Sequence, residues 1–201
     1  MRQTKLFSPF EMGPLMLKNR ISVPPMCMFV AKGGAVNDWH RVHYGKLAGS
    51  GASIVCIEAT AVTPDGRITD ADLGLWSDQL AVGFADLVRT MRAVDPLTKV
   101  AVQLNHAGRK GSGRAPGKEG YLTPEEGGWV PPAPSAVTYG EGHPLPREMT
   151  KGGIDAMVQA FANAADRAVR AGVDAIELHM AHGFLIHQFL SPVSNRRTDD
   201  Y

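Results

Sequence analysis

Two histidines three residues apart, His179 and His182, end a predicted strand and are the clearest candidates for chemistry in this sequence. Imidazoles at positions i and i+3 of a strand-end turn can converge on one atom, either as hydrogen-bond donors or as metal ligands. Neither a cysteine cluster nor an Asp/Glu-x-x-His repeat accompanies the pair, which disfavours a metal site. From the residues alone, a structural pair with satisfied hydrogen bonds is the simplest interpretation.

Four apolar segments predict the strands that must position these side chains, and they span residues 20–23, 53–59, 99–104 and 174–179. The second is almost continuously apolar, as expected of a parallel strand that is covered on both faces. Helices are predicted between the strands from their capping residues and apolar stripes. They begin at Asn37–Asp38 with Trp39, Val42 and Leu47 on one face, at Ser77 with a stripe from Leu80 to Met91, and at Thr150 with a stripe from Ile154 to Val169.

The alternation of strands and helices demands parallel strands with right-handed crossovers, which permits a doubly wound sheet or a barrel. A Gly-x-Gly-x-x-Gly turn after the first strand would favour the dinucleotide-binding fold, but residues 24–29 contain no glycine. Polar groups follow successive strands instead, with Cys27 after the first, Gln103 on the third and the histidine pair after the fourth. This layout is typical of barrel enzymes, so we expect an α/β fold of the (β/α)8 TIM barrel type.

A Gly/Pro-rich stretch, residues 109–149, interrupts this pattern. It is too long for a plain connection between a strand and a helix, and such loops are either functional or disordered. We interpret it as a long active-site loop over one face of the barrel. A disordered insertion is the alternative.

Composition excludes several classes of function. The chain has 201 residues, 44% of them apolar, with 21 Lys and Arg against 20 Asp and Glu. Such a chain can bury a core, and its near-neutral charge predicts a small-molecule substrate rather than nucleic acid or a membrane surface. No long apolar run and no secretory leader stand out, which favours a cytoplasmic location. The two cysteines, Cys27 and Cys56, are expected to be reduced thiols.

The motifs resemble, in order, those of the old yellow enzyme family, in particular its cysteine-containing bacterial ene-reductases and xenobiotic reductases. The resemblance extends over essentially the whole chain. The matching segments are residues 17–21, 25–27, 58–62, 66–69, 103–110, 146–149, 179–185 and 194–201.

This resemblance implies FMN as cofactor, NAD(P)H as electron donor and hydride transfer from the flavin to an activated alkene such as an α,β-unsaturated carbonyl. Hydride addition builds negative charge on the carbonyl oxygen, so two preplaced donors would lower the barrier. No metal is assigned. The implied flavin-binding residues are Pro24, Pro25, Met26, Cys27, Ala59 and Gln103, and the implied substrate-binding residues are Phe29, His179, His182 and Phe184, with the two histidines catalytic.

Two aromatic positions depart from the family pattern. The resemblance places a proton-donating tyrosine where this chain has Phe184, and a tyrosine is common where it has Phe29. Both changes keep the ring and delete the hydroxyl. Loss of a positioned acid typically costs about 10²- to 10⁴-fold in the step that it serves.

Length is the third departure, because a complete barrel needs about 250 residues and places its phosphate site after strands 7 and 8. We therefore expect residues 1–201 to form the N-terminal part of a single FMN-binding barrel domain, roughly its first four strand-helix units. The alternative is a catalytically incomplete half-barrel that needs a partner segment to bind FMN. Its partner would be a complementing C-terminal half or another copy in a homo-oligomer. A metal-dependent barrel hydrolase or aldolase is a third hypothesis.

Overall fold

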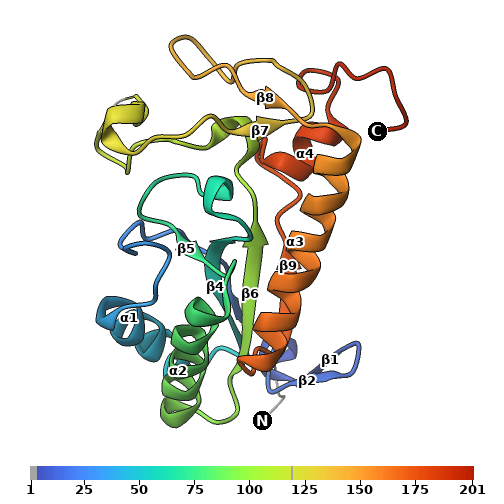
Figure 1. Ribbon diagram of the computed structural model, residues 1–201. Helices are drawn as coiled ribbons and strands as arrows, with labels where there is room; N and C mark the ends of the chain where they lie inside the picture. The colour runs from blue at the N-terminus through green and yellow to red at the C-terminus, as the bar shows by residue number, and fades with distance from the viewer. Residues whose placement is uncertain (1–3, 119) are drawn as a thin grey trace.

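The central feature of the fold is a parallel sheet with strands in the order β3-β4-β6-β9. The computed structural model describes residues 4–118 and 120–201. The strands are β3 (Ser22–Val23), β4 (Ile54–Ala61), β6 (Lys99–Asn105) and β9 (Ala175–Leu178), and the short β5 (Leu73–Gly74) also pairs with β4. All these pairings are parallel, so the carboxyl ends of the strands meet at the upper edge of the sheet in Figure 1. The four predicted strands are confirmed, with ends that differ by up to two residues.

One face of the sheet is covered by helices. Val55 and Ile57 of β4 and Val100 of β6 point toward this face, and they belong to one buried cluster with side chains of all three long helices. Figure 1 shows these helices, α1 (Asp38–Ala48), α2 (Asp78–Val94) and α3 (Lys151–Arg170), on the outside of the sheet.

The predicted helix starts are confirmed by their caps. The side chains of Asn37, Ser77 and Thr150 each accept a hydrogen bond from a backbone N–H in the first turn. Since the first N–H groups of a helix have no partner within the helix, these bonds determine where each helix begins.

The predicted apolar faces are right for α2 and partly wrong for α1 and α3. In α2, Phe84, Leu87, Val88 and Met91 are buried as expected. In contrast, Val42 of α1 is 73% exposed and Val158 of α3 is 66% exposed. The buried faces carry smaller or more polar residues, including His40 and Tyr44 in α1 and Ala164 and Ala168 in α3. Small side chains allow a helix to approach the sheet closely, which a search for large apolar residues does not detect.

The opposite, inner face of the sheet is mostly open. Ile54, Cys56 and Ala101 point inward, and Leu17 closes them off at the amino ends of the strands. Leu17 belongs to a hairpin that the sequence did not predict, formed by β1 (Phe10–Met12) and β2 (Leu15–Leu17). Above the hairpin lies a hollow of about 480 Å³. The accessible surface of 10510 Å² exceeds the roughly 9,200 Å² expected of a compact monomer of this mass, as an uncovered inner face requires.

Residues 109–149 lie over the carboxyl ends of the strands (Figure 1). Their short elements are the 3-10 turns η3 (Gly108–Lys110) and η4 (Pro124–Glu126) and the paired strands β7 (Pro132–Ala133) and β8 (Arg147–Glu148). The last helix, α4 (Leu185–Leu190), packs beneath this region through Leu185, which contacts Met149 and Ile154. The remaining 3-10 turns are η1 (Lys5–Phe7) and η2 (Pro64–Gly66).

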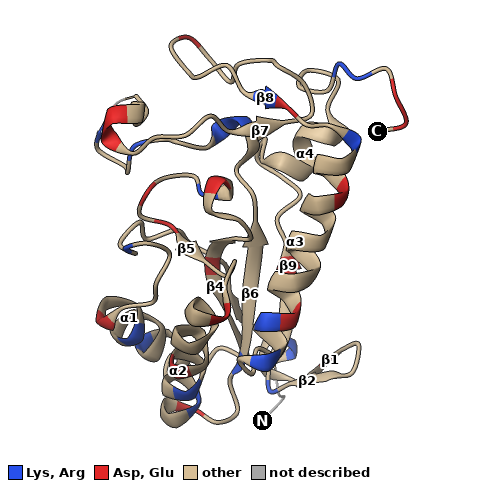
Figure 2. Ribbon diagram, in the orientation of Figure 1, with Lys and Arg blue, Asp and Glu red and all other residues tan. Residues whose placement is uncertain are grey.

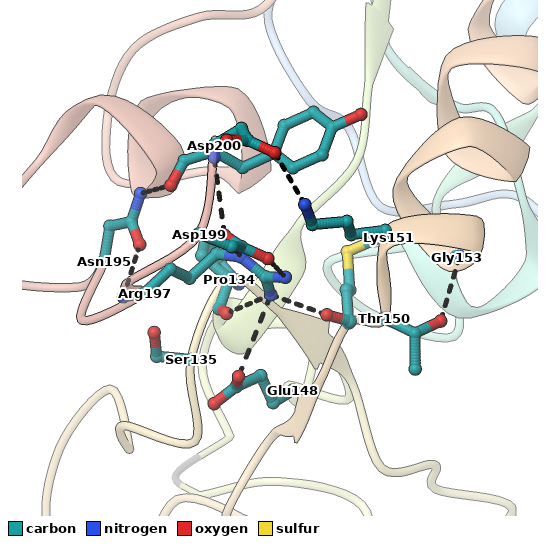
Figure 3. A network of polar contacts seen from close by, with 12 residues as sticks. Pro134, Ser135, Glu148, Thr150, Lys151, Gly153, Asn195, Arg197, Asp199 and Asp200 are labelled. Carbon is teal, nitrogen blue, oxygen red and sulfur yellow. Dashed lines mark hydrogen bonds and ion pairs between the residues drawn. The ribbon is translucent and has the colours of Figure 1, made fainter.

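Arg197 ties the end of the described chain to this loop region (Figure 3). Its guanidinium donates to the carbonyl oxygens of Pro134 at 3.0 Å and Met149 at 2.6 Å, and it pairs with Asp199. The pairing lowers the pKa of the Asp199 carboxyl to about 2. Because the Arg197 side chain is only 5% exposed, these bonds hold β7 and the start of α3 in a defined position.

Charged residues gather on the helices and loops, and most of β6 is free of them (Figure 2). Strand β4 contains one, Glu58. Among the described residues, none of the helices has the length and apolarity needed to span a bilayer.

Glu58 is a buried carboxyl group that holds the segment after β3. It accepts hydrogen bonds from the backbone N–H of Met28 at 2.8 Å and from the hydroxyl of Tyr44 at 3.2 Å, and its Oε1 lies 3.7 Å from Nε2 of His40. Burial raises the pKa of Glu58 to about 7 and lowers that of His40 to about 4. His40 is therefore neutral near pH 7 and the carboxyl of Glu58 is about half protonated there, so the two side chains do not form a full ion pair.

Phe84→Ala should lower the free energy of unfolding by about 3–5 kcal/mol, because Phe84 is completely buried between α2 and the sheet. Val82→Ala on the same helix is the control, since Val82 is 63% exposed and its truncation should change stability by less than about 0.5 kcal/mol. Urea unfolding followed by circular dichroism measures both. Equal effects of the two substitutions would contradict the helix face described above.

Glu58→Gln should remove a pH dependence of stability. The pKa of Glu58 is raised from 4.5 to about 7, so between these values the folded chain holds a proton that the unfolded chain has released. The free energy of unfolding therefore falls as pH rises from about 4.5 to about 7, by on the order of 3 kcal/mol, and levels off above.

The measurement is the difference in unfolding free energy between the unchanged chain and Glu58→Gln across this pH range. Subtraction removes the contribution of Asp72, whose pKa burial also raises, to about 6. Glu11→Gln, at an exposed position, is the control and should leave the slope unchanged. A difference that stays constant from about pH 4.5 to 7 would show that the Glu58 carboxyl is ionised in the folded chain as readily as in the unfolded one.

Candidate functional site

The sequence-predicted site residues lie at the carboxyl edge of the sheet in two groups. Cys27 and Ala59 lie on the β3–β4 side, and His179 and His182 follow β9 at the other side. From Cys27, after β3, to the histidines, after β9, there are three strand spacings, or roughly 14 Å along the sheet. This interval could accommodate a flat, multi-ring ligand between them.

Cys27 lies in an irregular segment between β3 and α1. Its thiol interacts with the backbone of Ala59, and burial, followed by the nearby Asp72 and Glu58, raises its pKa to about 12. Cys27 is therefore a neutral, half-buried thiol at physiological pH. Two residues on, Phe29 has a φ of 55°, a left-handed conformation that is unusual for an aromatic residue, next to the Met28 N–H that Glu58 holds.

Gln103 and Glu177 are paired across β6 and β9 on the inner face. The side-chain amide of Gln103 donates to Glu177 at 2.6 Å, and the second carboxylate oxygen lies 3.8 Å from the sulfur of Cys56. Asn105, two residues after Gln103 and so on the same face of β6, is 1% exposed. Neither its amide nitrogen nor its amide oxygen has a hydrogen-bond partner in the described part of the chain. Two inner-face amides thus lie between the Cys27 segment and the histidines.

His179 and His182 lie together with Phe184. The ring of His179 meets that of His182 at 5.1 Å and that of Phe184 at 4.6 Å between centroids, both edge to face. Nδ1 of His179 accepts the backbone N–H of Ala181 at 3.4 Å, which leaves the ring proton on Nε2 as a donor. Burial, followed by the proximity of His182, lowers the pKa of His179, so this ring is neutral.

The turn that carries this pair has an unusual backbone. His182 and Gly183 have φ values of 56° and 75°, and Phe184 then caps α4. The buried Gln188 on α4 donates to the carbonyl oxygens of Gly183 at 2.7 Å and Ala107 at 3.0 Å. One side chain therefore holds the turn after β9 against the turn after β6.

Lys110 is a site residue to which sequence reasoning assigned no role. Its ammonium donates to the carbonyl oxygen of His182 at 2.9 Å and lies 4.8 Å from the ring centroid of Phe184 and 5.0 Å from that of Tyr139. The available signal in the sequence was that Lys110 lies in the turn that follows the polar end of β6. Glu177 was also missed, although its register opposite Gln103 follows once β6 and β9 are paired.

The structure thus brings Cys27 together with Ala59, and His179 with His182 and Phe184. Pro24 and Pro25 line the hollow of the inner face, with Glu177. A second, more apolar hollow lies between α3 and α4 and includes none of the predicted site residues.

The relatives that match this chain are oxidoreductases that use NADPH or NADH, according to their names. The chain is 45% identical over 198 residues to an NADPH dehydrogenase of Clostridium acetobutylicum and 43% identical over 199 residues to an NADPH dehydrogenase of Bacillus subtilis. It is 42% identical to an NADH:flavin oxidoreductase of Gibberella zeae. These alignments cover 98% of the chain but 54%, 54% and 49% of the relatives, so the chain spans about half of their length.

Solved structures agree with this. Morphinone reductase superimposes with a TM-score of 0.83 at 30% identity, over 98% of this chain and 53% of that protein, and another structure of it holds tetrahydroNAD. Old Yellow Enzyme from Pichia superimposes with a TM-score of 0.84 at 26% identity, over 98% of this chain and 51% of that protein. The sheet and its outer helices are therefore about half of a TIM barrel.

A family model, NADH:flavin oxidoreductase / NADH oxidase, matches residues 5–201. The fold and these matches lead to one conclusion: the chain belongs to the NADH:flavin oxidoreductase / NADH oxidase family, the FMN- and NAD(P)H-dependent old yellow enzymes.

Proposed function

We propose that this chain supplies the flavin-ring and substrate side of an FMN-dependent enzyme that takes hydride from NAD(P)H and reduces an activated alkene. The observation that carries the proposal is the histidine pair, His179 and His182, which lies across the inner-face amides from the Cys27 segment. Unpaired Cys27 and Cys56 support a reducing, cytoplasmic location.

The residues present fit the ring system of FMN. A flavin has a pyrimidine edge of hydrogen-bonding groups, and the amides of Gln103 and Asn105 lie on the inner face, the latter buried without a partner in the described chain. A buried amide without partners is costly unless a ligand satisfies it. Ala59, with its small side chain, and the segment from Pro24 to Cys27 would line the ring. The phosphate site expected after strands 7 and 8 lies outside the matched half.

Bound FMN would supply hydride to the β-carbon of the alkene. The chain's own contribution is to hold the carbonyl oxygen of the substrate, through Nε2–H of His179 and the ring of His182. A neutral imidazole that is already oriented stabilises the negative charge that grows on this oxygen without reorganisation. Phe29 and Phe184 would supply apolar walls for the substrate, and the neutral Cys27 thiol would contact the ring and tune its reduction potential.

A second candidate is a half-barrel without activity of its own. The observation in its favour is the apolar surface on the β9 side, where Leu178, Val158 and Leu190 are 49%, 66% and 67% exposed. The relatives are about twice as long as this chain, so their remaining half is long enough to cover such a surface. A complementing C-terminal half is the partner that we propose, in preference to a second copy in a homo-oligomer.

The 201-residue chain by itself should bind FMN weakly, because it offers contacts to the ring and lacks the charge-assisted phosphate contacts. Addition of the C-terminal half of a relative, such as the Bacillus subtilis NADPH dehydrogenase, should produce a yellow complex. Fluorescence titration of FMN with and without this half measures the difference. Stoichiometric, tightly held FMN on the chain alone would refute the proposed division of the site.

Phe184→Tyr should accelerate alkene reduction in the completed, FMN-loaded barrel, by up to about 10²-fold, because it adds an acidic hydroxyl and barely changes the volume of the ring. Flavin reduction by NAD(P)H needs no acid here and should be unchanged. Stopped-flow spectroscopy with cyclohexenone separates the two half-reactions. If the tyrosine variant is no faster in the oxidative half-reaction, protonation does not occur at this position.

A further inference from the structure

Reduction of an alkene requires a proton as well as a hydride, and the residues around the histidine pair limit its source. Phe184 has no ionisable proton, and the rings of His179 and His182 are both committed to the carbonyl oxygen in the proposed function. The group that remains next to Phe184 is the ammonium of Lys110, 4.8 Å from the centre of its ring. In model peptides a lysine ammonium and a tyrosine phenol are acids of nearly equal strength.

Contacts within the fold hold the ammonium of Lys110 next to Phe184. Its ammonium donates to the carbonyl oxygen of His182 and lies against two aromatic rings, Phe184 and Tyr139, so it has one hydrogen bond and two cation–π contacts. These contacts counter the tendency of a lysine to extend into solvent.

The backbone of the turn that carries Lys110 is also held in position, by Gln188. Gly108 begins the turn with a φ of 57°, and a Cβ at this position would lie 2.3 Å from the side-chain oxygen of Gln188. The same oxygen accepts the N–H of Arg109 at 3.2 Å, while the amide nitrogen holds Gly183. Gln188 therefore sets the distance between the turn that carries Lys110 and the turn that carries His182.

We infer that Lys110 is the general acid of alkene reduction in this protein, a role that rests on the proposed function. An Nζ–H bond of Lys110 breaks as a C–H bond forms at the α-carbon, and hydride from the reduced flavin forms the C–H bond at the β-carbon. The alkene gains two electrons, the flavin loses two, and the neutral amine of Lys110 recovers its proton from solvent.

Two substitutions separate an acid from a structural cation. Lys110→Arg keeps the positive charge, the hydrogen bond to His182 and the contacts with the rings, but a guanidinium does not release its proton in proteins. Lys110→Met keeps the stem and removes the charge. Lys46→Met is the matched control, since Lys46 is exposed on α1, away from the site.

The measurement is flavin reoxidation by cyclohexenone in the barrel completed with a C-terminal half and loaded with FMN. We expect both Lys110 variants to slow this step by roughly 10²-fold or more, and Lys46→Met to leave it unchanged. Tyr139→Phe keeps the ring against Lys110 and removes the phenol, so it tests whether that hydroxyl is the acid instead. Phe184→Tyr should restore the rate in the Lys110→Met background, with a larger gain than in the unchanged protein.

A second readout needs no cofactor. In ¹H–¹⁵N spectra of the 201-residue chain, an immobilised ammonium bonded to His182 should give a signal that Lys110→Met abolishes and Lys46→Met retains. Absence of that signal would contradict the geometry on which the role depends.

The outcomes distinguish the two proposals. Reoxidation of Lys110→Arg at the unchanged rate would overturn the role of Lys110 and leave the proposed function standing, and loss of activity in Tyr139→Phe would move the acid to that phenol. If the unchanged, FMN-loaded protein is reduced by NAD(P)H but not reoxidised by the enone, the proposed function itself fails, and the role of Lys110 with it.

Discussion

The parallel pairing of four strands is the constraint on which the rest of this structure depends. A parallel pair cannot be joined by a tight turn, so each strand must be followed by a crossover that packs on the sheet. In this chain α1, α2 and α3 pack on one face, and the carboxyl ends of all four strands consequently meet at one edge. Residues that are more than 150 positions apart in sequence, Cys27 and His179, thereby come to the same edge.

That arrangement also explains why the inner face differs from the outer one. The outer side chains of β4 and β6 are large and apolar and are completely buried by the helices, whereas the inner face carries smaller or polar residues such as Ala101, Gln103 and Glu177. A barrel interior has limited room, and its carboxyl end must accept a ligand. The open hollow and the exposed apolar residues of β9 are the consequence of a sheet that covers about half of the barrel of its relatives.

Buried polar side chains convert this scaffold into a site with a defined geometry. Glu58 holds the backbone of the Cys27 segment, Gln188 joins the turns after β6 and β9, and Arg197 holds the loop region above them. Each of these side chains satisfies backbone groups that irregular segments would otherwise leave without partners. Because buried backbone groups without partners are destabilising, these hydrogen bonds keep the irregular loops at the carboxyl edge in one defined position.

Sequence patterns alone establish the order of the main strands and helices, the helix starts at Asn37, Ser77 and Thr150, and the side chains at the strand ends. These features follow from local capping and from short-range periodicity. The sequence did not determine which face of α1 and α3 is buried, since close packing there depends on alanines and on polar residues such as His40 whose partners are distant in the chain. The hairpin at the amino ends of the strands was missed for another reason, because each of its strands has only three residues, too few for an alternating pattern to stand out. Only the tertiary structure placed Lys110 beside His182 and Phe184, since that meeting requires β6 and β9 to pair and Gln188 to join the turns that follow them.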